Sequence, residues 1–252
     1  MTMRRFTIPS ADLAAPDITI TDGTFHHMTR VLRIKEGAEV IIADGTGSER
    51  QGVIHSIDAD TLSVRFMGEF SAPSPLLPAI TLYQGLPKGE KMEFIVQKCT
   101  ELGVATIVPF TAARSVKKVR PERSAGLISR WQKIAEEAAR QSGSRIPTVR
   151  LAAGLDEAIG QSSSQCLKLL LWEDERQVTL RETIASLPVQ NKVEVIVGPE
   201  GGITSEEAAD ARQKGFIPVS LGRNILRTET AGLVIVSILR FQWGDLGGDN
   251  PR

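Results

Sequence analysis

The chain has 252 residues, of which 41% are hydrophobic and 24% are charged, and its 30 Lys and Arg balance its 30 Asp and Glu. This composition is typical of a soluble globular protein with a real apolar core, and the length suits a small domain joined to a larger one. No apolar run approaches the roughly eighteen residues that a membrane span needs, and the first residues lack a secretory signal. We therefore expect a cytoplasmic protein without membrane association.

Cysteine and histidine usage gives no indication of a metal site. Cys99 and Cys166 lie in predicted elements without metal-ligand spacing, and the three histidines form no ligand motif. The sequence predicts reduced, buried thiols and no bound metal.

Positive charge is concentrated in one segment although the net charge is zero. Residues 1–72 hold 7 Lys and Arg against 10 Asp and Glu, residues 111–150 hold 10 against 3, and residues 151–252 hold 10 against 14. A charged segment is most often a solvated helix face. Its enrichment in arginine, whose guanidinium suits phosphate oxygens, favours a phosphate-facing surface.

The N-terminal part of the sequence predicts a small β-rich domain. Short apolar or alternating runs predict strands at residues 6–8, 38–43, 51–57 and 61–66. Residues 25–32 are the helical candidate, and the whole pattern suggests a small β-barrel. Residues 71–78 contain three prolines, which neither a helix nor a central strand tolerates, so we place a domain boundary between residues 72 and 73.

From residue 80 onward, strands alternate with helices. The expected strands are residues 80–85, 104–108, 166–172, 193–197 and 217–221, and the expected helices are residues 92–103, 122–141, 179–187, 205–214 and 228–243. Thr204 and Glu207 have the capping-box spacing for the helix that starts at residue 205. This alternation predicts an α/β fold whose mostly parallel sheet is covered on both faces.

Two glycine-bearing loops near the C-terminus carry the clearest chemical signal. Gly198-Pro-Glu-Gly-Gly202 follows one predicted strand, and residues 222–230 follow the next and open the last helix. Taken alone, each loop is also consistent with an ordinary connection between a strand and a helix, and Thr228 with a simple helix N-cap. In this order they closely resemble the cofactor-binding loops of the SPOUT methyltransferases, in the branch that methylates uracil N3 of 16S ribosomal RNA.

The resemblance covers nearly the whole chain. Residues 88–103 are similar to the helix that opens the catalytic domain of that family, residues 130–147 to its central basic segment, and residues 27–33 to its small RNA-binding domain. It implies a PUA-like RNA-binding β-barrel in residues 1–72 and a SPOUT-type, trefoil-knotted α/β methyltransferase domain in residues 73–252. General topology rules alone argue against a knot. Because SPOUT proteins pair through the knot region, and the last helix is apolar on several sides, a homodimer is expected.

The resemblance also implies S-adenosylmethionine as the cofactor. Closely approaching loop backbones can hold an adenine and a ribose, which suits small residues, while leucines and isoleucine can enclose the adenine ring. Core packing is the alternative role for these apolar residues. The predicted cofactor-binding residues are Leu171, Glu173, Gly198, Pro199, Glu200, Gly201, Gly202, Leu221, Gly222, Ile225, Leu226, Thr230 and Ala231.

The implied acceptor, uracil N3, carries a proton that must leave before or during methyl transfer. Glu200 and Glu229 are candidates for the base, and Arg227 is a candidate for stabilising the anionic oxygens of a deprotonated uracil. Either glutamate has a structural alternative, since Glu229 at a helix start complements the helix dipole. The predicted catalytic residues are therefore Arg227, Glu229 and Glu200, with the base left open.

The expected partner is 16S ribosomal RNA within the small ribosomal subunit, near the decoding centre. The predicted RNA-binding residues are Arg4, Arg5, His27, Arg30, Arg33, Arg114, Lys117, Lys118, Arg120, Arg140 and Arg145. One alternative is ribose 2′-O methylation. Sequences of that SPOUT branch resemble Ser-Leu-Asn-Val-Ser at the place where this chain has Leu226-Arg-Thr-Glu-Thr230, and this difference speaks against the alternative. Another is a non-catalytic RNA-binding assembly factor, which the intact loops disfavour.

Overall fold

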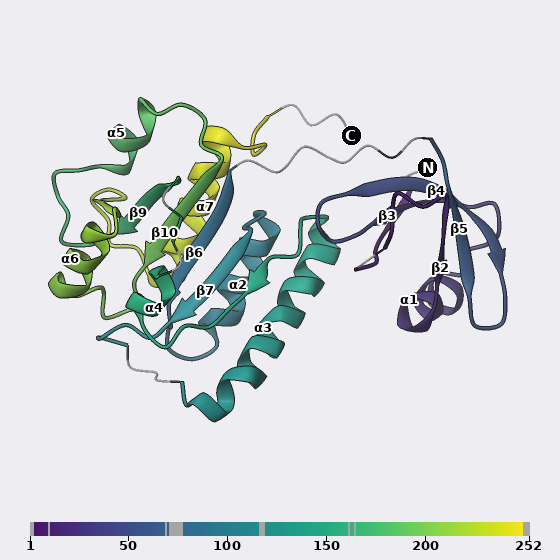
Figure 1. Cartoon of the computed structure of the whole chain (residues 1–252), viewed down its shortest axis with the longest axis horizontal. Coiled ribbons are helices and arrows are strands. Elements are labelled where there is room, and N and C mark those ends of the chain that lie inside the picture. Colours follow the sequence, from purple (N-terminus) through teal and green to yellow (C-terminus); the bar gives the residue numbers. More distant parts are fainter. Residues whose placement is uncertain are drawn as a thin grey trace. The chain divides into compact units, whose positions relative to one another are not determined.

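The computed structural model describes residues 3–9, 11–68, 70, 78–115, 119–160, 162–163 and 165–248 (Figure 1). Two residues of the predicted RNA-binding set, Lys117 and Lys118, lie outside these ranges. The chain divides into two compact units, Met1–Pro75 and Leu76–Arg252. No helix within the described ranges has the length and apolar character needed to cross a membrane.

The first unit is built on a five-stranded sheet with the strand order β1-β3-β4-β5-β2. The strands are β1 (Arg4–Thr7), β2 (Asp17–Ile20), β3 (Glu39–Ala43), β4 (Glu49–Ile57) and β5 (Leu62–Phe66). Strand β1 runs parallel to β3, and the other neighbours are antiparallel. The sequence analysis missed β2, whose four residues alternate between polar and apolar but form a run too short to stand out, with only Ile20 buried.

The predicted helix of this unit is two short pieces instead of one. Helix α1 (Asp22–His26) begins earlier than expected and continues directly into a π-helix, η1 (His27–Val31). In the π-helix, the Leu32 N–H donates to the His27 carbonyl at 3.0 Å, five residues back. The wide turn buries Phe25 and Met28 in the core of the unit and leaves His27 exposed.

The second unit contains a six-stranded sheet whose neighbouring strands are all parallel, in the order β11-β9-β10-β6-β7-β8. The strands are β6 (Ala79–Gly85), β7 (Thr106–Phe110), β8 (Thr148–Val149), β9 (Leu167–Leu171), β10 (Lys192–Val197) and β11 (Ile217–Val219). The parallel α/β prediction is confirmed. Strand β8 was not predicted, because two residues carry no periodicity.

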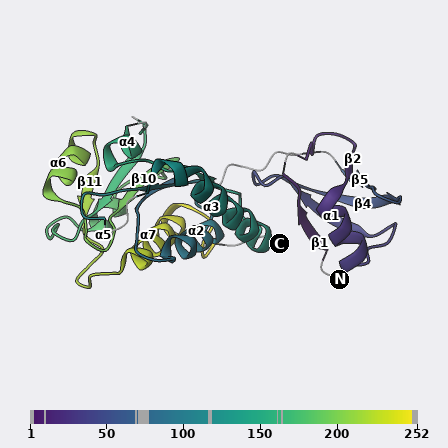
Figure 2. The same cartoon turned by 90° about the horizontal axis from the view of Figure 1, so that it is seen from below.

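Helices cover both faces of this sheet, with α4 and α6 on one side and α2 and α7 on the other (Figure 2). The helices are α2 (Lys91–Glu101), α3 (Pro121–Ser142), α4 (Leu155–Ile159), α5 (Leu180–Ala185), α6 (Ser205–Gln213) and α7 (Thr228–Trp243). Ile80 and Leu82 of β6 face one core, and Tyr83 faces the other. Burial on both faces explains why the strands are continuous apolar runs. The capping box of Thr204 and Glu207 is present, as predicted.

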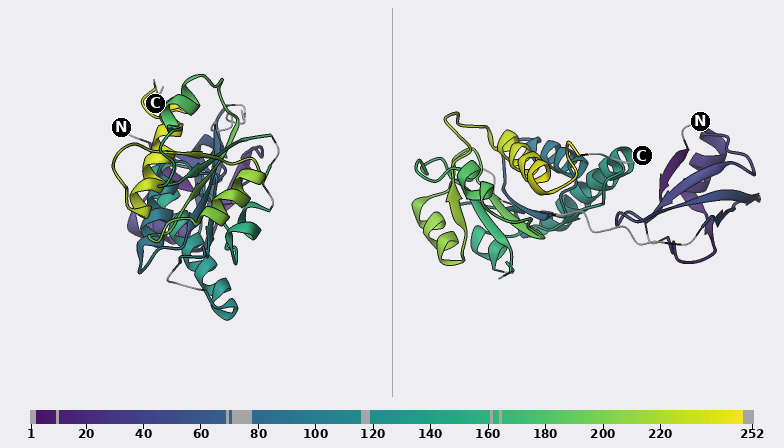
Figure 3. Two further views of the ribbon diagram at one scale, coloured as in Figure 1. Left: turned by 90° about the vertical axis from the view of Figure 1, so that its left-hand side faces the viewer. Right: turned by 90° about the horizontal axis from the view of Figure 1, so that it is seen from above.

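Helix α7 is fixed against the end of α2 (Figure 3). The buried Arg240 of α7 donates to the carbonyl oxygens of Leu102 at 3.2 Å and of Gly103. These carbonyls lie at the C-terminal end of α2, where the helix leaves them without intrahelical partners. The contact therefore sets the position of α7, whose first turn helps to form the site. The trefoil knot does not follow from the strand order and stays a prediction.

Candidate functional site

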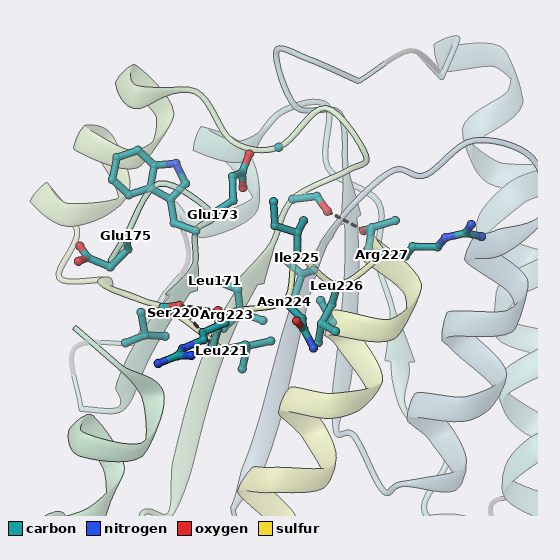
Figure 4. Close-up of a pocket in the computed structure, with 18 of the residues that line it drawn as sticks. Leu171, Glu173, Glu175, Ser220, Leu221, Arg223, Asn224, Ile225, Leu226 and Arg227 are labelled. Carbon is teal, nitrogen blue, oxygen red and sulfur yellow. Dashed lines mark hydrogen bonds between the residues drawn. The ribbon is translucent and has the colours of Figure 1, made fainter. Parts of the chain in front are cut away.

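A cavity of about 880 Å³ lies at the carboxyl ends of β9, β10 and β11. Leu171, Val197 and Val219 end these three strands and line the cavity, together with the loops that follow them and the start of α7. In open α/β sheets, ligands bind at this edge, and the volume lies in the range of small-molecule sites. Figure 4 shows Glu173 and Glu175 on one side of the cavity and Ile225 and Leu226 on the other.

Most of the predicted cofactor-binding residues lie in the wall of this cavity. They are Leu171, Glu173, Gly198, Pro199, Glu200, Gly202, Leu221, Gly222, Ile225, Leu226 and Ala231. Gly201 and Thr230 are not part of the wall. Gly201 packs instead against the backbone of Arg114, and Thr230 is exposed on α7.

The wall also contains residues that the sequence analysis did not select. They are Trp172, Glu175, Arg176, Thr179, Val197, Val219, Ser220, Arg223, Asn224 and Thr228. Most follow directly on the carboxyl ends of β9 and β11, a position that could have identified them once the strands were predicted. Glu175 differs from the others because its carboxylate accepts hydrogen bonds from the N–H groups of Gln177 and Val178 and so stabilises its own loop.

Two glycines permit close approaches that a side chain would block, and a third lines the cavity with a positive φ. A Cβ on Gly85, the last residue of β6, would lie 2.5 Å from Pro199 Cδ, so β6 ends directly against the first loop. A Cβ on Gly202 would clash with the Glu173 carboxylate. Gly222 has φ of +129°, and a Cβ there would point into open space at the cavity wall. Gly85 was missed, although a glycine at the end of a strand is a signal for close approach.

A buried hydrogen-bond chain connects β6, α7 and the first loop. Gln84 Nε2 donates to Thr228 Oγ1 at 2.8 Å, and the Thr228 hydroxyl donates to the Gly198 carbonyl at 2.6 Å. Thr228 is the first residue of α7, while Arg227 occupies the N-cap position and makes no side-chain capping bond. The N-cap interpretation of Thr228 is therefore wrong, because its hydroxyl bonds to a neighbouring loop and not to its own helix.

The two candidate bases, Glu200 and Glu229, meet at one lysine. Lys91 Nζ lies 3.0 Å from Glu200 Oε1 and 3.2 Å from Glu229 Oε2. The contact with Glu229 Oε2 is an ion pair without good hydrogen-bond alignment. Burial raises the pKa of Glu200, but bonds from backbone N–H groups and from Lys91 outweigh it, so its pKa lies below the ordinary value. The pKa of Lys91 is raised by its bonds to Glu200 and then Glu229.

Arg227 borders the cavity but is exposed. Its side chain extends away from the other labelled residues in Figure 4. No ion pair of Arg227 is found within the described part of the chain. The guanidinium is thus available to a bound molecule beyond the cavity rim.

The predicted RNA-binding residues of the first unit gather on two adjoining segments. Arg4 donates to the Leu32 carbonyl at 3.0 Å, which places β1 beside the π-helical segment. His27 and Arg30 lie in that segment and Arg33 follows it, and all three are exposed. Arg5 is paired with Glu49 at 2.9 Å, so part of its charge is balanced.

In the second unit, the described basic residues have different surroundings. Arg114 Nη1 lies 3.4 Å from the Gly201 carbonyl, beside the first loop. Arg120 is exposed at the start of α3, and Arg140 is paired with Glu137 near its end. Arg145 is only half-buried.

Within the described ranges, no group of three or more His, Cys, Asp or Glu side chains could hold a metal ion. Both cysteines are free thiols. Cys99 is buried as predicted, whereas Cys166 is only partly buried, because it precedes β9 instead of lying within it.

The parallel sheet and its glycine-lined cavity define a ligand-binding α/β protein. Residues 73–240 match the family model of an RNA methyltransferase domain, and residues 20–67 match that of an RNA methyltransferase PUA domain. The chain belongs to this RNA methyltransferase family. The family and the enzyme class predicted from the sequence are confirmed.

Relatives of the chain match over nearly their whole length. The ribosomal RNA small subunit methyltransferase E of Bacillus subtilis is 33% identical over 241 residues, which cover 93% of this chain and 94% of that protein. A structure of the enzyme of that name from Neisseria gonorrhoeae, bound to S-adenosyl methionine, is 30% identical with a TM-score of 0.81, covering 97% of this chain and 99% of that one. A putative methyltransferase from Legionella pneumophila, also with bound cofactor, is 31% identical with a TM-score of 0.78, covering 98% and 100%.

Proposed function

We propose that this protein transfers the methyl group of S-adenosylmethionine to N3 of one uridine in 16S ribosomal RNA, near the decoding centre of the small subunit. The observation that carries the proposal is the cavity at the carboxyl edge of the sheet, which both glycine-bearing loops and the start of α7 enclose. The names of the relatives, which are ribosomal RNA small subunit methyltransferases, support the substrate.

The cavity suits the cofactor in size and in chemistry. Leu171, Leu221 and Leu226 supply apolar surface for an adenine ring, and loop backbones at Gly198 and Gly222 leave room for direct polar contacts. Bound S-adenosylmethionine supplies a methyl carbon that its sulfonium already activates, so the residues around it act mainly by orientation.

The acceptor side needs a group that handles the N3 proton. As N3 forms its bond to the methyl carbon, the carbon–sulfur bond breaks and the N3 proton passes to a base. Glu200 and Glu229 remain the candidates, although the lowered pKa of Glu200, to which its bond from Lys91 contributes, weakens Glu200 as a proton acceptor. Arg227, exposed at the rim, is suited to stabilise the negative charge on the uracil oxygens.

RNA binding is assigned to both units. In the first unit, the exposed His27, Arg30 and Arg33 offer a basic edge beside Arg4, and the described residues include no ion-pair partner for them. In the second unit, Arg114 lies next to the first cofactor loop, and Arg120 lies at the start of α3. Lys117 and Lys118, between them in sequence, belong to the same proposal.

We further propose a cytoplasmic homodimer that pairs through the face formed by α2 and α7. Phe94 of α2 and Phe241 of α7 are 45% and 70% exposed, and the two helices pack together on one face of the sheet. Such exposed aromatics favour an interface, and a two-fold axis would bury both copies at once.

The test incubates the purified protein with methyl-labelled S-adenosylmethionine and with small ribosomal subunits or free 16S RNA. Nucleoside mass spectrometry should detect N3-methyluridine as the labelled product. Label on a ribose 2′-oxygen would support the rival activity instead. Cofactor binding without any transfer would support the non-catalytic assembly factor.

A further inference from the structure

Lys91 occupies a position that helix energetics disfavour. It is the first residue of α2, and the residue before it, Glu90, makes no side-chain capping bond. The N-terminal end of a helix carries partial positive charge, which makes a cation there unfavourable. Local conflicts of this kind are expected where a residue serves a site instead of its own helix.

The ammonium group of Lys91 joins three chain segments. It lies 3.0 Å from Glu200 in the first loop and 3.2 Å from Glu229 in the first turn of α7. The Glu200 carboxylate also accepts the Lys88 N–H, at 3.1 Å and 3.2 Å from its two oxygens. The start of α2 is therefore bonded to both segments that flank the cavity.

This cluster is partly withdrawn from water. The side chains of Lys91, Glu200 and Glu229 are 33%, 28% and 16% exposed. Partly buried ion pairs are screened by salt and water less than surface pairs. A network of three charges also holds its side chains in place better than an isolated pair does. Removing Lys91 would leave two neighbouring carboxylates that repel each other.

We propose that Lys91 is a positioning residue of the methyl-transfer site, which holds the first loop and the start of α7 at the spacing that the cofactor needs. The inference rests on the proposed function of the cavity. Because Lys91 does not line the cavity, it acts through Glu200 and Glu229 and not by touching the cofactor.

The chain provides a matched control for this idea. Lys98, two turns further along α2, is 35% exposed and pairs with Glu101 at 2.8 Å, which lies on the same helix. Its ion pair is as close as those of Lys91 but joins no second segment. A Lys98→Met variant thus measures the cost of losing a lysine from α2 without loosening the cavity.

The experiment compares Lys91→Met, Lys91→Arg and Lys98→Met in the full-length protein by calorimetric titration with S-adenosylmethionine and by steady-state kinetics on small ribosomal subunits. Lys91→Met should weaken cofactor binding about tenfold, the equivalent of two partly exposed ion pairs. KM for the cofactor should rise more than kcat falls. Lys91→Arg should recover most of the affinity, and Lys98→Met should behave like wild type.

A double-mutant cycle separates positioning from a general loss of stability. Adding Lys91→Met to a Glu200→Gln, Glu229→Gln background should cost little further affinity, because the partners of Lys91 are already neutral. If Lys91→Met does not fold, Glu229→Gln takes its place and should also weaken binding. Equal affinity of Lys91→Met and Lys98→Met, or full additivity in the cycle, would overturn the inference alone. A wild type that neither binds the cofactor nor methylates would overturn the proposed function and this inference together.

Discussion

At the scale of single residues, the site depends on side chains whose partners lie far away in sequence. Thr228 resembles a helix cap in its local sequence, yet its hydroxyl connects Gln84 with the Gly198 carbonyl. Lys91 resembles an ordinary helix lysine, yet it pairs with Glu200 in the first loop and with Glu229 in α7, both more than a hundred residues away. Local pattern identifies neither role, because neither partner is within reach of a sequence window.

The Thr228 hydroxyl gives the first prediction. Thr228→Val keeps the shape of the side chain but removes the bonds that the hydroxyl makes with Gln84 Nε2 and with the Gly198 carbonyl, at a cost of about 1–3 kcal/mol. The first loop should shift, and S-adenosylmethionine affinity measured by calorimetry should fall roughly tenfold. Thr228→Ser, which keeps the hydroxyl, is the control and should bind nearly as well as wild type. Unchanged binding by Thr228→Val would show that the bond chain does not shape the cavity.

The two thiols give a prediction on reactivity. Burial raises the pKa of Cys99 to about 12, and burial followed by the charge of Glu194 raises the pKa of Cys166 to about 11. Because the thiolate is the reactive form, raised pKa values keep both thiols protonated near pH 8. Iodoacetamide should therefore label neither thiol rapidly in the folded protein, whereas it should label both thiols in denaturant. Mass spectrometry measures the extent of labelling. Fast labelling of Cys166 at pH 8 in the folded state would contradict this, and labelling should accelerate as the pH rises toward 11.

At the scale of elements, the sequence was most informative where a strand ends in a glycine-bearing loop. The runs that became β9, β10 and β11 were predicted, and the family resemblance implied that two of the loops after them share one cofactor site. The structure supplies the physical reason, since carboxyl ends of parallel strands lie at one edge of the sheet. The order of the strands was not predictable from periodicity, because the central strands of this sheet are buried on both faces. The π-helix η1 was also not predictable from the sequence, since its residues show an ordinary α-helical pattern.

The second loop gives the prediction at this scale. Gly222→Val places a branched side chain at φ of +129°, strained by about 1–3 kcal/mol, and directs it into open space at the cavity wall. Cofactor binding measured by calorimetry should be lost. Gly215→Val is the matched control, because Gly215 also has a positive φ, +88°, but lies outside the cavity wall. If Gly222→Val stays folded and binds like wild type, the cofactor does not occupy this cavity.

At the scale of the whole molecule, the chain combines two compact units. The PUA-domain model matches within the first unit, and the RNA methyltransferase domain model matches nearly all of the second. The net charge of zero hides this division, because the basic residues gather in the segment around α3 while the first unit is slightly acidic. Composition alone therefore argued against a nucleic-acid partner, and the distribution of charge argued for one. The knot rests on the family resemblance alone, since no local pattern encodes threading, whereas the pairing of two chains rests on that resemblance and on the exposed aromatics of α2 and α7.

The proposed dimer can be tested directly in solution. Light scattering at micromolar concentration should give twice the chain mass of 27.4 kDa. Phe241→Asp, which puts a charge on the proposed α2–α7 face, should shift the protein toward the monomer without unfolding it, because this side chain is exposed. A wild-type monomer at that concentration would contradict the proposal.

The central claim, methylation of one uridine of 16S ribosomal RNA at N3, is tested most directly by mapping modified nucleotides in ribosomal RNA from cells that lack this protein. One N3-methyluridine near the decoding centre should be absent from 16S RNA. It should return when the wild-type protein is supplied and stay absent with Gly222→Val. An unchanged set of N3-methyluridines in the deletion strain, or the loss of a ribose 2′-O-methyl group in their place, would contradict the account.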